Sequence, residues 1–222
     1  MSAREDTRTL LLSTAVRLFG AHGYDGVTTR MLAEAAGANI AAIKYHFGSK
    51  DELYLGVIDH IVELVTPRLD LVLSMAGQAR SIASTDPTRQ AVLVTQLVEA
   101  VLSILLRTPA LKPMVPFVLR ELFVPGPHFN RLYDAVPRRL HEALTELVAW
   151  VLGMAADAPE TIVRTHALVG QLVVFQIGRG ILQRRLGIDD YGDPEIDLIQ
   201  RQASRSVLMS LGLPTPDSGP AP

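Results

Sequence analysis

One stretch constrains this chain more than any other: residues 28–47, TTRMLAEAAGANIAAIKYHF, in which two short helical patterns meet at Gly37. Leu32, Ala35 and Ala36 repeat at i, i+3 and i+4, which gives the first pattern one narrow apolar face. Gly37 follows the last of them, where a helix end requires the positive φ that glycine reaches without steric cost. The spacing predicts two helices joined by a tight turn, a helix-turn-helix.

Polar side chains at both helix starts support this prediction. Thr28 or Thr29 can accept a hydrogen bond from an early backbone N–H of the first helix, and Asn39 can cap a second helix over residues 40–47. The second helix has a single apolar anchor, Ile43, and short isolated helices are marginal in water. We therefore expect other helices to hold it in place.

The remaining chain is also helical by pattern, and no convincing period-2 strand occurs. Pro67 predicts a kink or stop in the helix that begins at Lys50, because proline lacks the backbone donor and crowds the preceding turn. A first helix is expected over residues 5–22, and the two helices of the helix-turn-helix follow, the second over 40–47. Pro and Gly breaks delimit the six further expected helices, which cover residues 50–75, 88–107, 109–123, 128–153, 159–186 and 194–211. The predicted fold class is all-α, with about nine helices: a three-helix head and a C-terminal helical bundle.

The phrase T-T-R-x-L-A-x-A-A-G-A-N-x-A-A-I-K-Y-H-F-G-S-K-x-E-L, residues 28–53, resembles the DNA-binding module of the tetracycline-repressor-like (TetR) family of bacterial transcriptional regulators. Its second half, I-K-Y-H-F-G-S-K-D-E-L-Y, is similar to the CecR-like branch of that family. The resemblance covers about the first quarter of the chain. It implies a DNA-binding head followed by a helical domain for effector binding and dimerisation.

On this basis we expect three regions. Residues 1–50 form the DNA-binding head, residues 51–213 the effector-binding and dimerisation domain, and residues 214–222 a disordered tail that cannot bury apolar surface. The net charge is −2, but residues 1–50 hold six Lys/Arg and four Asp/Glu, and the remainder holds 15 and 19. The head therefore carries the sign that DNA binding requires.

In a helix-turn-helix the second helix enters the major groove, and contacts to phosphates position it without reading sequence. The resemblance implies phosphate contacts by Tyr45 and Lys50. Lys44 stands where many members of the family carry leucine, so the operator sequence does not follow from the resemblance. The predicted DNA-binding residues are Thr28, Thr29, Arg30, Asn39, Ile40, Ala41, Ala42, Lys44, Tyr45, His46 and Lys50. The alternative interpretation of this stretch is an ordinary helical hairpin.

Two C-terminal helices present small and apolar residues along one face each. Hydrophobic residues make up 48% of the chain and the mean hydropathy is +0.24, so a self-association surface would cover an apolar excess. The predicted dimer interface comprises Ala167, Gly170, Gln171, Val174, Ile177, Gly178, Ile181, Ile196, Ile199, Ala203 and Val207. Paired across a two-fold axis, these faces would form a four-helix bundle. The alternative is that both faces pack inside one subunit.

The family resemblance implies an effector cavity in the helical core, apolar with a few polar groups. The candidate lining residues gather most of the aromatics: Met114, Phe117, Arg120, Phe123, His128, Phe129, Tyr133, Trp150, His166, Phe175 and Gln176. A plain core is the alternative for each of them. Pro113, Pro116 and Pro137 predict irregular helices around 109–140, which pack imperfectly and favour a pocket.

Catalytic and metal chemistry have no positive support in the sequence. The six histidines are scattered without metal-ligand spacing, and no G-x-S-x-G or phosphate loop occurs. Cysteine is absent, which excludes disulfides and thiolate sites. Charges interrupt every apolar window and the N-terminus lacks an apolar signal segment, so we expect no membrane span and a cytoplasmic location.

The predicted function is a homodimeric DNA-binding regulator without a cofactor, and we expect a repressor that a small, largely apolar effector releases from double-stranded operator DNA. Two alternatives stay open. One is a DNA-binding dimer without a small-molecule effector; the other is a helical protein-interaction module with a vestigial head.

Overall fold

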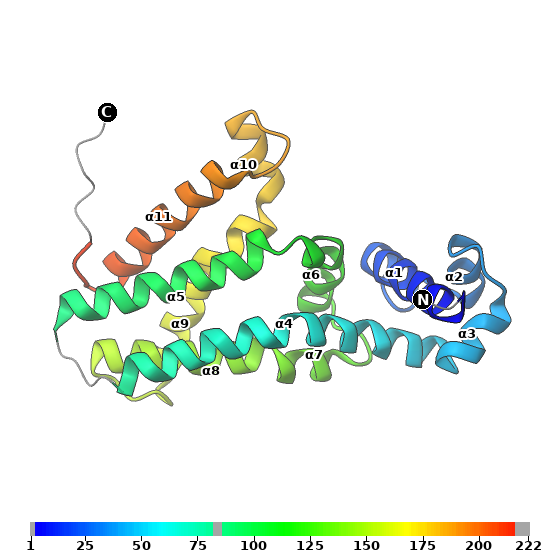
Figure 1. Ribbon diagram of the computed structural model, residues 1–222. Coiled ribbons are helices and arrows are strands. Elements are labelled where there is room, and N and C mark those ends of the chain that lie inside the picture. The colour runs from blue at the N-terminus through cyan, green and yellow to red at the C-terminus, as the bar shows by residue number, and fades with distance from the viewer. Residues whose placement is uncertain (1–2, 82–85, 216–222) are drawn as a thin grey trace. The chain divides into compact units, whose positions relative to one another are not determined.

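In the computed structural model, residues 3–81 and 86–215 are described, and within these ranges the chain is helical without a strand (Figure 1). The all-α prediction is therefore confirmed. The elements are α1 (Ala3–His22), α2 (Thr29–Ala35), α3 (Ile40–Phe47), α4 (Lys50–Ser81), α5 (Pro87–Arg107), a 3₁₀ helix η1 (Pro109–Met114), α6 (Val115–Phe123), α7 (Phe129–Ala135), α8 (Pro137–Leu152), α9 (Pro159–Ile177), α10 (Arg179–Leu186) and α11 (Asp193–Ser210).

The described helices outnumber the predicted ones because three predicted segments are divided. The predicted helix 109–123 is split into the 3₁₀ helix η1, which contains Pro113, and α6. The predicted helix 128–153 is split into α7 and α8, and Pro137 begins α8, where a missing N–H costs nothing. The predicted helix 159–186 is split at Gly178. The stop that Pro67 could have caused does not occur, because α4 continues through this residue to Ser81.

The chain forms two compact units. Unit 1 comprises Met1–Thr66 and Pro109–Pro137, and unit 2 comprises Pro67–Thr108 and Arg138–Pro222. These units describe packing, whereas the predicted boundaries at residues 50 and 213 divide the chain by function and stay predictions. Residues 216–222 of the predicted disordered tail lie outside the described residues.

The core of unit 1 joins the helix-turn-helix to α1, to the start of α4 and to α6. Its largest fully buried side chains include Phe19, Tyr54 and Phe117. Helices α1 and α6 approach each other closely at Gly20, where a Cβ would lie 2.9 Å from the backbone nitrogen of Phe117. Glycine is therefore required at that crossing, because any side chain there would push the two helices apart.

Polar contacts also fasten the α6–α7 segment to α4 within unit 1. The buried Glu121 carboxylate accepts hydrogen bonds from the Tyr54 hydroxyl and from the backbone N–H of Gly126, the latter at 3.2 Å. Burial, followed by the adjacent Glu121 carboxylate, raises the pKa of Tyr54, so its hydroxyl stays a donor. One turn earlier on α4, Asp51 Oδ2 lies 2.9 Å from His128 Nε2.

The core of unit 2 is built on α5, which packs against α11 and α9 (Figure 1). Asp86 caps α5 by accepting from Thr88 N at 3.0 Å, and Arg107 at its other end pairs with Asp193 and Asp197 of α11. Among the described residues, α5 alone has the length and apolar composition of a membrane span. A core helix passes the same test, and Leu97, Val101 and other buried α5 residues form the centre of this core.

Candidate nucleic-acid interface

The predicted helix-turn-helix is present as α2 and α3. The Thr28 side chain accepts a hydrogen bond from Met31 N at 3.2 Å, and the Asn39 side chain accepts from Ala41 N at 3.0 Å. Gly37 has φ +59° between the two helices. The turn closes with Ala38 N donating to the Ala33 carbonyl at 2.9 Å. Capping and turn residues therefore act as the sequence predicts.

Helix α3 has one side in the core and one side in solvent. Ile43 is 2% exposed and packs in the unit 1 core, with Leu32 and Ala33 of α2. On the other side, Ile40 is 49% exposed and Tyr45 is 64% exposed, while Ala41 and Lys44 are also exposed. This face carries an aliphatic side chain, a small one, a cation and a phenol, which are groups suited to base edges and phosphates.

The other predicted DNA-binding residues differ in how exposed they are and in the contacts that they already make. Thr28, Arg30 and Asn39 are exposed, and Thr29 and His46 are half-buried. Arg30 pairs with Glu34 at 2.7 Å, with both side chains well exposed, so solvent screens the pair and a phosphate can compete for Arg30. Ala42 is half-buried against the core, which gives it a packing role in addition to any contact.

Lys50 has a structural position that the sequence pattern does not reveal. Its ammonium donates to the carbonyls of Tyr24 at 3.1 Å and Val27 at 3.0 Å, and it lies 4.0 Å from the Tyr24 ring centroid. Burial, and then the Asp51 carboxylate, raise the pKa of Tyr24. Lys50 is the first residue of α4 and therefore ties the start of that helix to the loop that precedes α2.

Lys50→Met is expected to lower the melting temperature of the protein by several degrees, because two carbonyls lose a charged donor. A phosphate contact would act differently: its loss lowers the slope of log affinity against log salt by about 0.9 per contact. We expect Lys50→Met to leave that slope nearly unchanged and Lys44→Ala to reduce it. Thermal unfolding and salt-dependent DNA titrations of both variants measure the difference, and the reverse pattern would make Lys50 a phosphate contact.

Arg8 was not among the predicted contacts, yet it lies beside the recognition helix. Its guanidinium carbon is 5.2 Å from the ring centroid of Phe47, and the side chain is exposed. The sequence carries no signal for this position, because Arg8 precedes α3 by more than thirty residues and only the packing of α1 brings the two together. It adds a cation to the edge of the interface.

The residues predicted to line an effector site are divided between the two units. Unit 1 holds Met114, Phe117, Arg120, Phe123, His128, Phe129 and Tyr133, and unit 2 holds Trp150, His166, Phe175 and Gln176. Met114 and Phe117 are buried in the core of unit 1, whereas Phe123 is 68% exposed. The structure therefore does not bring this set together within one unit.

A partly open cavity of about 40 Å³ lies in unit 2, among α5, α8, α9 and α11. Aliphatic side chains line it, including Val98, Leu147, Leu168 and Val207, together with Thr165, whose hydroxyl donates to the Thr161 carbonyl. None of the eleven predicted effector residues lines this cavity. The prediction followed aromatic residues, whereas branched aliphatic residues bound the space where four helices meet.

The predicted dimer residues also separate into two groups. On α9 and α10, Val174, Ile177 and Ile181 are 50%, 48% and 75% exposed, and Ala167 and Gly170 are exposed, while Gln171 and Gly178 are partly covered. On α11, the four predicted residues Ile196, Ile199, Ala203 and Val207 are buried in the unit 2 core. The α11 stripe therefore packs inside the subunit, chiefly because α5 lies against it.

The described part of the chain contains no recognisable metal site or catalytic site. No group of three or more His, Cys, Asp or Glu side chains there could hold a metal ion. His141 and His166 face each other at 5.7 Å between ring centroids, and burial together with the His166 charge lowers the pKa of His141. The Thr145 hydroxyl lies 3.3 Å from His141 Nδ1, but it donates to the His141 backbone carbonyl at 2.7 Å. The hydroxyl and the two imidazoles therefore form no recognisable catalytic arrangement.

Comparisons with known proteins match both parts of the chain. Residues 11–57 match the family model of bacterial regulatory proteins of the tetR family, and residues 91–213 match the C-terminal domain of the HTH-type transcriptional dual regulator CecR. Over 199 residues the chain is 30% identical to the CecR regulator of Shigella flexneri, covering 89% of this chain and 87% of that protein. Over 180 residues it is 26% identical to the HTH-type regulatory protein RaaS of Mycobacterium tuberculosis, covering 80% and 75% of the two chains.

Solved structures agree in fold. AibR in complex with isovaleryl coenzyme A and operator DNA superposes with a TM-score of 0.58 at 16% identity, covering 91% of this chain and 97% of that chain. A TetR-family regulator from Mesorhizobium loti gives a TM-score of 0.55 at 16% identity, covering 96% and 98%. At these identities the similarity concerns the fold alone.

Proposed function

Because the chain belongs to the TetR family of transcriptional regulators, on its CecR-like branch, we propose that it represses transcription as a cytoplasmic homodimer that a small apolar effector releases from operator DNA. It is a regulator and not an enzyme. The observation that carries DNA binding is the exposed face of α3, held by Ile43 on one side and presenting Ile40, Lys44 and Tyr45 on the other.

Two copies of α3 are needed to read two half-sites, and the exposed face of α9 and α10 supports pairing. Val163, Ala167, Gly170, Val174, Ile177 and Ile181 follow each other at intervals of four and three residues, and all six are exposed. This spacing is typical of a helix that packs along a second helix, and the small central residues allow close approach. We call these six residues the α9 seam, and its proposed occupant is the same seam of a second copy.

The proposed effector site is the cavity of unit 2. Its aliphatic lining favours an alkyl or short acyl group, and its volume of about 40 Å³ is far below the 300–1,000 Å³ of typical ligand pockets. An effector must therefore separate the surrounding helices as it enters. The bound isovaleryl coenzyme A of AibR illustrates one acyl ligand on this fold, but the effector class proposed here rests on the cavity lining.

Helix α4 is the proposed route from effector to DNA, because it supplies Lys50–Thr66 to unit 1 and Pro67–Ser81 to unit 2. An effector acts only by its difference in affinity for two conformations, and a coupling of typically 1–3 kcal/mol changes DNA affinity 5- to 150-fold. Tilting α4 would change the spacing of the two recognition helices on the operator.

The test is a fluorescence-anisotropy titration of the full chain against duplexes from its own promoter and a scrambled duplex, with and without short-chain acyl compounds. Specific binding that weakens with an acyl compound supports an effector-released repressor. Specific binding that no compound changes favours a regulator without an effector. Equal, weak binding to both duplexes favours a vestigial head on a protein-interaction module.

The cavity offers a matched control for the effector. Val98→Phe fills the space from α5 without touching the head, so it should remove the response to the compound and keep operator affinity. Loss of both properties would point to a folding defect, which circular dichroism detects.

A further inference from the structure

The α9 seam crosses a break in the chain before it reaches its last residue. Gly178 separates α9 from α10, and Ile181 lies beyond it with 75% of its surface exposed. Arg179 stands between Gly178 and Gly180, and the first turn of α10 has no side-chain cap. A segment with two glycines and only eight helical residues has little intrinsic stability. Something else must fix its direction.

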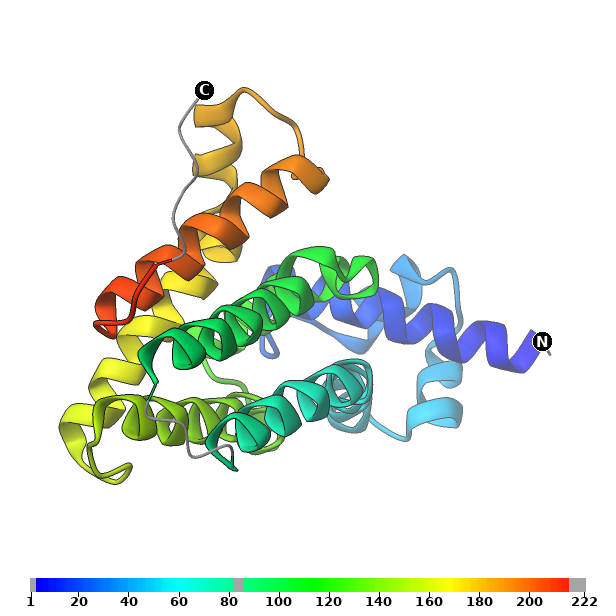
Figure 2. The same ribbon diagram turned by 60° about the vertical axis from the view of Figure 1, so that its left-hand side comes forward.

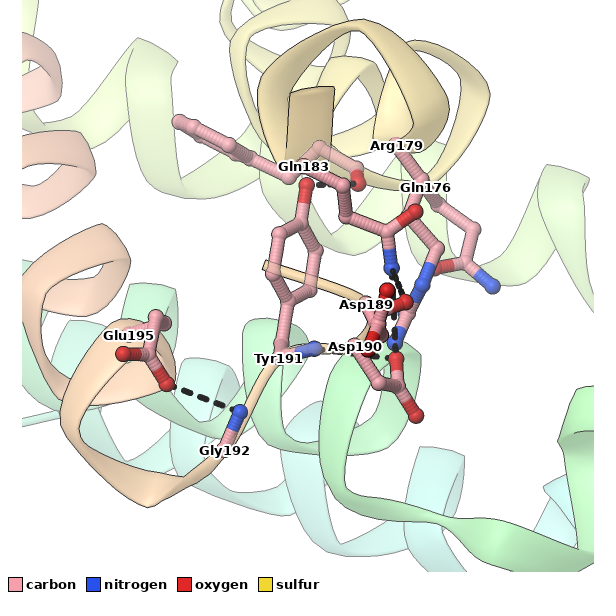
Figure 3. A network of polar contacts seen from close by, with 9 residues as sticks. Gln176, Arg179, Gln183, Asp189, Asp190, Tyr191, Gly192 and Glu195 are labelled. Atoms are coloured by element: carbon pink, nitrogen blue, oxygen red, sulfur yellow. Dashed lines mark hydrogen bonds and ion pairs between the residues drawn. The ribbon is translucent and has the colours of Figure 1, made fainter. Parts of the chain in front are cut away.

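The side chain of Arg179 supplies that constraint (Figure 3). Its guanidinium pairs with the Asp190 carboxylate, donates to Gln176 Oε1 at 3.4 Å, and lies 4.4 Å from the ring centroid of Tyr191. Only 20% of the Arg179 side chain is exposed. A planar guanidinium can stack on a ring and bind a carboxylate at the same time, which an ammonium does poorly.

The partners of Arg179 are themselves fixed. Tyr191 is 6% exposed, and its hydroxyl donates to the Phe175 carbonyl at 3.3 Å, pointing at the backbone of α9 in Figure 3. The Asp190 carboxylate accepts from Tyr191 N at 2.9 Å and from Gln183 Nε2 at 3.4 Å. Gln183, one turn further along α10, also donates to the Asp189 carbonyl at 3.0 Å.

The contacts therefore attach α10 to the loop that leads into α11. Both views of the fold place this loop and α10 together at the end of unit 2 opposite α8 (Figures 1 and 2). The loop has no exposed large apolar side chain of its own among residues 187–192, whereas α10 exposes Ile181 and Leu186, Ile181 the more fully. The polar contacts thus hold in place a helix that exposes apolar side chains, above all Ile181, to solvent in a single subunit.

We infer that Arg179, with Asp190 and Tyr191, forms a clasp that positions Ile181 of α10 in line with the α9 seam for pairing with a second copy of the chain. This inference rests on the proposed dimer. Arg179 is a positioning residue: it acts on association through Ile181. Without the clasp, Ile181 would have to be ordered when the subunits meet, and that ordering weakens association.

The test is a double-mutant cycle on the dimer dissociation constant of the full chain, measured by sedimentation. Arg179→Met is expected to raise this constant about tenfold, and Ile181→Ala by a similar factor. If Arg179 acts through Ile181, the double variant weakens the dimer about tenfold as well. Independent effects would multiply to about 100-fold and would overturn the inference, as would an unchanged constant in Arg179→Met.

Two controls separate this clasp from general stability and from the dimer itself. Arg139→Met removes an ion pair with Asp70, at 2.7 Å in the same unit but outside the seam, and should leave the dimer constant unchanged. Arg179→Lys keeps the charge and replaces Arg179→Met in the cycle if that variant does not fold. If Ile177→Glu leaves the dimer dissociation constant unchanged, the α9 seam is not the dimer contact, and both the proposed dimer and the clasp are rejected. If Ile177→Glu raises this constant and Arg179→Met does not, only the clasp is rejected.

Discussion

Lys44→Glu is expected to weaken operator binding by about 100-fold or more, while the protein keeps its fold and its dimer. Lys44 is exposed on α3 beside the buried anchor Ile43, so its side chain carries no packing role. A lost base or phosphate contact costs about 1–3 kcal/mol, and a dimer loses the contact at both half-sites. The new carboxylate adds repulsion from the phosphates.

Arg17→Glu is the matched control for this variant. It changes the charge by the same amount on an exposed residue of unit 1, and it follows Arg8 by nine residues, two and a half helical turns, so it projects from the opposite side of α1. We expect its affinity to fall by less than about threefold, because only the general field of the protein changes. Anisotropy titrations at matched salt compare the two variants. Equal losses would mean that net charge, and not the α3 face, accounts for binding.

The helix-turn-helix could be predicted from sequence because local rules determine it. Thr28, Gly37 and Asn39 act within three residues of themselves, through caps and a turn, and Ile43 is the single apolar side chain that α3 has to bury. Such features leave a signature in a short window. The face opposite Ile43 follows from helical periodicity alone.

The role of Lys50 could not be predicted in this way. A lysine after a recognition helix is compatible with a phosphate contact, and only the fold brings the carbonyls of Tyr24 and Val27 to its ammonium. The packing of α11 shows the same limit. Its apolar stripe, with Ile199 and Ala203, indicates that something covers it, but periodicity does not distinguish α5 of the same subunit from a second subunit.

The effector prediction followed large aromatic side chains, and the cavity has none in its lining. Aromatic residues fill space, as Phe117 of α6 does against Tyr54 of α4, whereas a void remains where branched side chains from four helices meet. Composition reports which residues are bulky. It does not report where their packing leaves a gap.

The second large effect is expected at the α9 seam. Ile177→Glu should convert the dimer to monomers at micromolar concentration. Ile177 is 48% exposed in the subunit, and burying each isoleucine stabilises an interface by about 1.5–3 kcal/mol. Two-fold symmetry removes this contribution twice and places two unpaired carboxylates in an apolar contact. The dimer dissociation constant should therefore rise by about 100-fold or more, as sedimentation of the full chain would show.

Operator binding should follow the loss of the dimer, because each monomer then holds one half-site without the second. On a single half-site duplex, Ile177→Glu should bind as weakly as the unaltered chain does at the same subunit concentration, since α3 is untouched. Val92→Glu, which places the same charge on a 53% exposed valine of α5 in the same unit, should leave association and operator affinity unchanged. If both variants dissociate equally, the cause is a destabilised unit 2. If only Ile177→Glu dissociates, the two subunits meet at the α9 seam, where Val174 and Ile181 lie on either side of Ile177 in sequence.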